Sequence, residues 1–183
     1  MGCVLQAGLG QNPSRQAALK AGLPDTISAV TINKVCGSGL QTVMQGAQSI
    51  KSGDNNVVIA GGMENMSGAP HLANIRAGIK FGEGSLIDHM QHDGLTCPFE
   101  GWGMGSAAEW TAEEFGITRN EQDELSAESH KRAAEATEQG WYKEEIIPLE
   151  AGKIKQREDV ICDEGLRSDS TVESLGKLRP AFA

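Results

Sequence analysis

Apolar and polar positions near the start of the chain alternate between two spacings, which predicts strands joined by helices. Residues 29–35 alternate and are rich in β-branched side chains, as is typical of a strand. Between Cys36 and Ser52 the apolar residues recur at helical spacing, and Gly53 suits the end of that helix. A short apolar run at 56–60 predicts a second strand. The order strand, helix, strand implies a parallel crossover and an α/β fold.

A further strand end and a helix are expected before this unit. Residues 3–6 are typical of the tail of a strand. Asn12 is a good N-cap, Pro13 suits a first helical turn and Gly22 suits the exit from a helix. We therefore expect a short helix over residues 13–21.

The pattern changes after residue 67. Residues 68–105 are rich in Gly, His and Asp and show little periodicity, and so long an irregular stretch usually has a function. Helical spacing returns at 105–115 and again at 118–139. In the second of these helices, Thr118 and Glu121 have the spacing of a capping box.

The last part of the chain has weaker signals. Residues 146–149 predict an extended segment, and residues 153–163 predict a polar strand or hairpin. A helical turn is expected at 174–177.

Composition and charge narrow the classes of function. The chain has 183 residues and a formal net charge of −9, which argues against general nucleic-acid binding. No apolar run is long enough to span a membrane and no secretory leader is visible, so we expect no membrane partner and a cytoplasmic location. The sequence has no close cysteine pair and no histidine cluster with ligand spacing, so we expect no metal. The four cysteines are Cys3, Cys36, Cys97 and Cys162.

Cys36 is the candidate nucleophile because of its place between a strand and a helix. Backbone N–H groups at a helix start carry partial positive charge, which favours a thiolate, and a thiolate is a strong nucleophile. Gly37 and Gly39 would let a substrate carbonyl approach the backbone. The broad apolar stripe of the helix suits burial between two layers. The alternative is a buried structural cysteine, which these residues alone leave equally open.

The residues around Cys36 form part of a longer set of motifs. The segment Asn33-x-x-Cys36-x-Ser38-Gly39 is similar to the acyl-enzyme motif of the thiolase family, which includes acetyl-CoA acetyltransferases and 3-ketoacyl-CoA thiolases. Other segments resemble that family in its order and at about its spacing. They are Gly10-Gln11-Asn12-Pro13, Ala60-Gly61-Gly62-Met63-Glu64, Asp93-Gly94-Leu95-Thr96, Met104-Gly105 and Lys177-Leu178-Arg179-Pro180.

The resemblance implies part of a layered αβα fold with an inserted α/β loop domain. It assigns residues 1–66 to a partial N-terminal half-domain with a nucleophile elbow. It assigns residues 67–183 to the loop domain, which binds coenzyme A and carries a tetramer-forming segment. For the full-length protein the resemblance implies a homodimer or homotetramer.

The resemblance also implies an acyl-CoA C-acyltransferase of fatty acid metabolism. Such an enzyme condenses two acyl-CoA molecules in a Claisen reaction, or cleaves a 3-ketoacyl-CoA with coenzyme A. Cys36 would carry the acyl group, and coenzyme A and its thioesters would be substrates, with no cofactor held tightly. Gly103 stands where short-chain members often have histidine, which predicts a reshaped acyl pocket.

Four further residues match coenzyme A contacts of the family. Arg167 matches a position that meets the nucleotide, where a guanidinium can pair with phosphate, and Ser174 matches a position along the pantetheine channel. Leu95 and Met104 match apolar residues of that channel. The alternative for Arg167 and Ser174 is ordinary solvated surface, and for Leu95 and Met104 it is core packing.

Two motifs that the family uses for acid–base chemistry are not in the sequence. One is a Gly-His-Pro motif and the other a Cys-Gly-Gly-Gly motif, and none of the four histidines is followed by proline. We therefore expect an internal fragment that lacks the extreme N-terminus and the C-terminal half, and that is inactive by itself. Two alternatives stay open: a non-catalytic module for coenzyme A binding or assembly, and a β-ketoacyl synthase-like condensing enzyme. The Gly37-Ser38-Gly39 segment favours the thiolase assignment over the latter.

Overall fold

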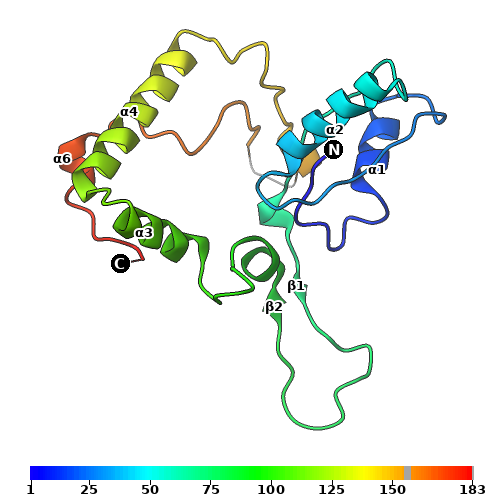
Figure 1. Cartoon of the computed structure of the whole chain (residues 1–183), viewed down its shortest axis with the longest axis horizontal. Coiled ribbons are helices and arrows are strands. Elements are labelled where there is room, and N and C mark those ends of the chain that lie inside the picture. The colour runs from blue at the N-terminus through cyan, green and yellow to red at the C-terminus, as the bar shows by residue number, and fades with distance from the viewer. Residues whose placement is uncertain (155–157, 183) are drawn as a thin grey trace. The chain divides into compact units, whose positions relative to one another are not determined.

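A computed structural model describes residues 1–154 and 158–182 of the chain. It separates into two compact units, Met1–Met104 and Gly105–Ala183, which are described in turn (Figure 1). The division predicted from the resemblance, into residues 1–66 and 67–183, describes the domains of the family and not compact units of this structure. It stays a prediction.

The centre of the first unit is the extended segment at the N-terminus. Gly2 forms parallel bridges to Ile32 on one side and to Gly62 on the other. The bonds are short: Gly2 N–H donates to the Gly61 carbonyl at 2.8 Å, and Cys3 N–H donates to the Ile32 carbonyl at 3.0 Å. The expected parallel direction is confirmed, with Gly2 between the two flanking segments.

The prediction of regular strands is wrong, however. In the described chain, residues 3–6, 29–35 and 56–60 form no continuous ladder, and pairing is confined to isolated bridges. The apolar side chains of these segments suit a strand that is covered on both faces, but the described residues do not cover them. In the segment 56–60, for example, Val57 is 83% exposed and Ile59 is 64% exposed. The chain is extended there without being a strand.

Two helices accompany these segments. Helix α1 (Pro13–Lys20) begins after the Asn12 cap, whose side chain accepts a bond from Arg15 N–H, as predicted. Helix α2 (Ser38–Ser52) ends at Gly53 in the left-handed conformation, also as predicted. The start of α2 lies two residues beyond the expected one.

Helix α2 buries three polar or small residues and exposes its apolar stripe. Its buried residues are Ser38, Thr42 and Gly46, which share one face. The large apolar side chains of the expected stripe are exposed, against the prediction that they lie between layers. They are Leu40, Val43, Met44 and Ile50.

Glycine allows α2 to approach the N-terminal segment closely. A Cβ on Gly2 would lie 2.6 Å from the Ser38 carbonyl carbon and 2.7 Å from the Gly39 nitrogen. The Thr42 hydroxyl meets the neighbouring segment, donating to the Gly61 carbonyl at 3.0 Å and accepting from Gly61 N–H at 2.9 Å. These contacts fix the first turns of α2 against backbone rather than against side chains.

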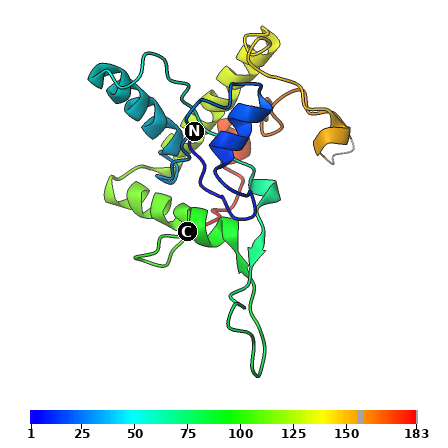
Figure 2. The same cartoon turned by 90° about the vertical axis from the view of Figure 1, so that its right-hand side faces the viewer.

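The rest of the first unit is a hairpin arm. A 3₁₀ turn η1 (Met66–Gly68) leads to strand β1 (His71–Leu72), which pairs antiparallel with β2 (Ile87–Asp88). Both views show the intervening loop as a long arm (Figures 1 and 2). A π-helical turn η2 (Met90–Gly94) follows. The irregular stretch expected at 68–105 therefore contains a short hairpin and a π-turn that its sequence did not predict.

Four helices are described from the end of the first unit onward. Helix α3 (Met104–Glu114) and helix α4 (Arg119–Glu138) match the two expected helices closely. The capping box of Thr118 and Glu121 is present in both directions, which confirms that prediction. Two single turns follow, α5 (Ala151–Ile154) and α6 (Val172–Leu175).

The segment between α4 and α6 differs in part from expectation. Leu149 is extended, as predicted, and forms an antiparallel bridge with Val160. The polar strand or hairpin expected at 153–163 is helical at its first two residues, which belong to α5. Residues 155–157 of that prediction lie outside the described part of the chain. Over residues 1–154 and 158–182, none of the helices combines the length and apolar character that a membrane crossing requires.

The close approach at Gly2 gives a direct test of this packing. We expect Gly2→Ala to lower the free energy of unfolding by about 1–3 kcal/mol, because the new methyl group would press on rigid backbone of α2. The matched control is Gly61→Ala, whose Cβ would meet only the flexible Met1 side chain at ordinary contact distance. Urea unfolding followed by circular dichroism measures both. Equal stability of the two variants would contradict this account.

Candidate active site

Cys36 lies on the turn that leads into α2. The helix has Gly37 as its N-cap, so the cysteine precedes the cap by one residue. Its side chain is exposed, in contrast to the buried Ser38 two positions later. The alternative of a buried structural cysteine is therefore wrong.

The residue before the cysteine has an unusual backbone. Val35 has φ +49°, in the left-handed region that a β-branched residue rarely enters. For an L-residue this conformation costs about 1–2 kcal/mol relative to the right-handed one. The turn closes through two backbone bonds, from Gly37 N–H to the Lys34 carbonyl at 3.1 Å and from Ser38 N–H to the Val35 carbonyl at 3.0 Å. Backbone strain of this kind concentrates at functional sites.

Two side chains of the motif bond to this turn. The Asn33 Oδ1 atom accepts from Val35 N–H at 2.9 Å. The Ser38 hydroxyl accepts from Lys34 N–H at 2.8 Å and donates to the Val35 carbonyl at 2.6 Å. Both residues belong to the motif around Cys36, but the sequence alone gave them no role. The signal available was the known preference of asparagine to bond the backbone two residues on.

Leu95 and Met104, both expected along the pantetheine channel, are brought together by the structure. Met104 N–H donates to the Leu95 carbonyl at 2.9 Å, beside an antiparallel bridge between Thr96 and Gly103. Leu95 is half-buried and Met104 is exposed. Neither side chain is part of a closed core, so the alternative of plain core packing is not favoured.

A buried histidine supports the loop that ends at Leu95. His89 is 5% exposed, and its Nε2 atom accepts from Ala7 N–H at 3.3 Å. Nδ1 must then carry the proton, which it donates to Asp93 Oδ2 at 2.5 Å. Both ring nitrogens are engaged, so His89 holds the loop rather than serving Cys36 as a base. The sequence did not reveal this pairing, because Ala7 and His89 are far apart along the chain.

Arg167 and Ser174 lie in the second unit. Arg167 is exposed, and its backbone N–H donates to His130 Nδ1 of α4 at 3.3 Å. Ser174 is also exposed, and its hydroxyl belongs to the cap of α6, where it accepts from Thr171 N–H at 2.9 Å. A channel role for Ser174 would use the remaining hydrogen-bonding capacity of this hydroxyl.

An arginine clamp fixes α6, and with it Ser174, against α4. The Arg119 guanidinium contacts both carboxylate oxygens of Asp123, at 2.8 and 2.9 Å. It also donates to the Leu175 carbonyl at 2.5 Å and to the Leu178 carbonyl at 3.2 Å. Asp123 is 8% exposed, so this pair is partly removed from water. The sequence gave no signal for it beyond the i, i+4 spacing of the two residues.

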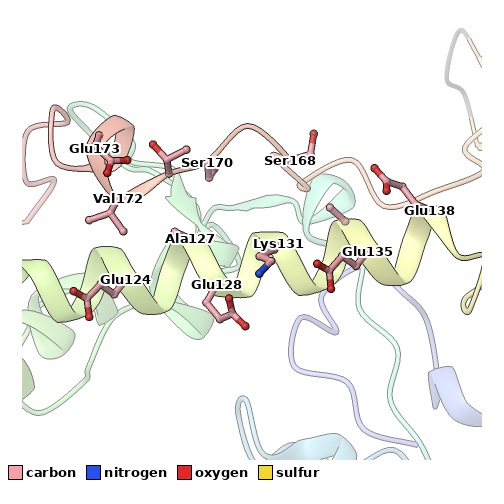
Figure 3. Close-up of a pocket in the computed structure, with 12 residues that line it drawn as sticks. Glu124, Ala127, Glu128, Lys131, Glu135, Glu138, Ser168, Ser170, Val172 and Glu173 are labelled. Atoms are coloured by element: carbon pink, nitrogen blue, oxygen red, sulfur yellow. The ribbon is translucent and has the colours of Figure 1, made fainter.

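An open groove of about 560 Å³ runs along α4 beneath the segment before α6. Figure 3 shows this segment crossing above the helix in the opposite direction, from Ser168 above Lys131 and Glu135 to Glu173 above Glu124. Five glutamates and one lysine line the groove. A phosphate-bearing ligand is disfavoured there by like charge, so the groove is not the place for a nucleotide.

Two of the other three cysteines are less accessible than Cys36. Cys3 is buried, and burial raises the pKa of its thiol, with the Glu64 carboxylate raising it further. Cys97 is half-buried in the turn before α3, where its N–H donates to the Trp102 carbonyl at 2.8 Å. Cys162 is exposed. Over the described residues, no group of three or more side chains has an arrangement that could hold a metal ion.

The comparisons with known proteins agree with one another. The family model described as the N-terminal domain of thiolase matches residues 1–183. An acetyl-CoA acetyltransferase of Escherichia coli (strain K12) is 50% identical, and a probable acetyl-CoA acyltransferase of Staphylococcus aureus (strain bovine RF122 / ET3-1) is 49% identical. Each alignment covers 100% of this chain and 47% of the relative, so the chain spans about half the length of these relatives.

A solved structure is similar over the same length. The crystal structure of the Acat5 thiolase from Ascaris suum in complex with coenzyme A has a TM-score of 0.85 and 37% sequence identity. The match covers 100% of this chain and 46% of that one. The expected thiolase-like α/β fold class is confirmed by this likeness.

The hydrogen bonds of Asp93 predict an effect of acid on stability. Bonds from His92 and then from His89 lower the pKa of the Asp93 carboxyl below its ordinary value of 3.8. A lowered pKa stabilises the fold above the ordinary value, and this contribution is lost as the pH falls through the lowered one. We expect Asp93→Asn to be less stable than wild type at pH 7, with a gap that narrows below about pH 4. Urea midpoints between pH 3 and 7 measure the gap, and a constant difference would rule out this role.

The contacts of Arg119 predict an effect on the free energy of unfolding. We expect Arg119→Ala to destabilise α4 and α6 by about 1–3 kcal/mol, because Asp123 is left without its cation in a partly buried position. The control is Arg132→Ala, which breaks the exposed pair with Glu128 and should lower stability much less. Urea unfolding monitored by the helical circular dichroism signal compares the two. Similar losses in both variants would contradict the clamp.

Proposed function

Because the chain belongs to the thiolase family, we propose that it supplies the nucleophile of an acyl-CoA C-acyltransferase. The observation that carries this proposal is the exposed thiol of Cys36 on a left-handed turn at the start of α2. An accessible cysteine in a strained turn that leads into a helix is suited to covalent catalysis.

The first step is transfer of an acyl group to the cysteine. The Cys36 sulfur attacks the thioester carbonyl carbon, an S–C bond forms, and the bond from that carbon to the sulfur of coenzyme A breaks. Coenzyme A leaves as a thiol with the proton that Cys36 gives up. In a condensation, the α-carbon of a second acyl-CoA loses a proton and attacks the acyl carbon, the bond from that carbon to the Cys36 sulfur breaks, and the freed thiolate takes up a proton. In a thiolytic cleavage, the Cys36 sulfur attacks the 3-keto carbon of a 3-ketoacyl-CoA, the bond from that carbon to the α-carbon breaks, and the α-carbon takes up a proton. The acyl group on Cys36 then passes to the sulfur of coenzyme A.

The proposed substrates follow from the relatives. Two of them are named for acetyl-CoA acyl transfer, and the similar solved structure contains coenzyme A. We assign the nucleotide contact to Arg167 and the pantetheine channel to Ser174, Leu95 and Met104. The exposure of Arg167 and the pairing of Leu95 with Met104 support this assignment.

Three broader features belong to the same proposal. The division into a half-domain at 1–66 and a loop domain at 67–183 is proposed from family architecture. A homodimer or homotetramer is proposed for the whole protein, and the exposed apolar stripe of α2 supports association. We also propose that the whole protein is cytoplasmic and acts in fatty acid metabolism.

Acylation of Cys36 tests the proposal. The chain is incubated with acetyl-CoA, quenched in acid and digested, and acetylated peptides are located by mass. Turnover is not expected from this sequence, which holds neither acid–base motif, but a single acetyl transfer to Cys36 is. Cys36→Ser should take up no label, because the hydroxyl is a far weaker nucleophile than a thiolate. Cys162→Ser is the matched control, since it removes another exposed cysteine and should leave the label unchanged.

Three other outcomes separate the alternatives. Label at Cys3, Cys97 or Cys162 would overturn the choice of nucleophile. Binding of coenzyme A without label would support a non-catalytic binding module. Neither binding nor label would count against any acyl-CoA role for this chain in isolation.

A further inference from the structure

The turn that carries Cys36 is unusual because it places its strain on a β-branched residue. Glycine is the usual occupant of the left-handed region, yet Val35 adopts it with φ +49°. Such a conformation persists only where the surroundings hold it. The contacts around Val35 therefore show what keeps the turn in place.

We propose that Asn33 and Ser38 are positioning residues that hold Val35 in the left-handed conformation and so fix the backbone that presents Cys36. The inference rests on the proposed function only in calling Cys36 the nucleophile. The conformational part depends on the turn alone.

Asn33 holds the turn from its N-terminal side. Its Oδ1 atom accepts from Val35 N–H at 2.9 Å, which fixes the peptide that enters Val35. The Asn33 Nδ2 atom reaches back to the Val4 carbonyl at 3.4 Å, in the N-terminal segment. The side chain is thus tied to the centre of the unit at one end and to the strained residue at the other.

Ser38 holds the turn from the helix side. Its hydroxyl accepts from Lys34 N–H and donates to the Val35 carbonyl, at 2.8 and 2.6 Å, so one group joins the peptide that precedes Lys34 to the peptide that follows the strained residue. Ser38 is 4% exposed and lies against Gly2, so its side chain has a fixed place. Cys36 takes part in none of these side-chain bonds and stays exposed.

A purely structural role would also lower stability when these residues change, so the test must address the strain itself. Glycine adopts φ +49° without the penalty of a β-branched residue. If Asn33 acts by holding Val35, its removal should matter much less once residue 35 is glycine. If Asn33 only stabilises α2, the effect should be the same in both backgrounds.

Amide hydrogen exchange at the turn measures this dependence. The probes are the N–H groups of Gly37 and Ser38, which close the turn onto Lys34 and Val35. We expect Asn33→Ala to speed their exchange about tenfold in the wild-type background but about threefold or less with Val35→Gly. Asn33→Asp keeps the acceptor oxygen and should restore exchange to within about twofold of wild type. The Ala21 N–H, which bonds to Ala17 in α1, reports any general unfolding.

Asn55→Ala is the matched control. Asn55 is another exposed asparagine, and its side chain bonds to Ser49 near the far end of α2. It should leave exchange at Gly37 and Ser38 unchanged. Ser38→Ala is a second variant for the proposal, and its effect on Gly37 should likewise shrink with Val35→Gly. Equal effects in both backgrounds, or no effect of Asn33→Ala at the turn, would overturn the proposal.

Acetylation of Cys36 by acetyl-CoA distinguishes this proposal from the proposed function. If wild type is acetylated, Asn33→Ala should lower the rate, and both Asn33→Asp and the double variant with Val35→Gly should recover it. If wild type is not acetylated while exchange depends on Val35 as expected, the positioning role stands and the acyl transfer proposal loses its support. Acetylation of wild type and Asn33→Ala at equal rates would remove the functional part of the inference.

Discussion

The first turn of α2 must pass within contact distance of the N-terminal segment, and this constraint shapes the whole first unit. A residue with a Cβ at Gly2 would collide with the backbone of Ser38 and Gly39. Because the helix starts so close to Gly2, the chain has only a few residues after Ile32 in which to reverse direction. The reversal is tight enough to push Val35 into the left-handed region, and it places Cys36 on the outside of the turn.

The stabilisation of this turn is polar rather than hydrophobic. The buried face of α2 consists of Ser38, Thr42 and Gly46, and the two hydroxyls bond to backbone groups of neighbouring segments. Such bonds have defined directions, whereas apolar burial has none. A site that must present one sulfur atom in one place benefits from directional contacts. The large apolar side chains of α2 are exposed and contribute little to holding the turn.

Local signals explain which parts of the fold could be predicted. The capping box at Thr118 and the glycine end of α2 involve residues only a few positions apart, and both were correct. The strands expected at 29–35 and 56–60 were not found, because a strand also needs partners that are distant in sequence. The same contrast holds at the site. Cys36 could be predicted because the residues next to it in sequence form a motif. The bond between Ala7 and His89 could not, because it joins two loops that are distant in sequence and leaves no local pattern.

Two buried polar pairs, one in each unit, follow the same physical logic. His89 is buried with both ring nitrogens occupied, and Asp123 is buried with its carboxylate paired to Arg119. Each buried polar group would be costly if left unpaired, so each pair fixes the loop or helix that it joins. One supports the segment that ends at Leu95, and the other supports α6 with Ser174. The residues proposed to contact coenzyme A are exposed or half-buried, and the groups that position them are buried. Substitutions at the buried positions should therefore change stability before they change ligand contacts.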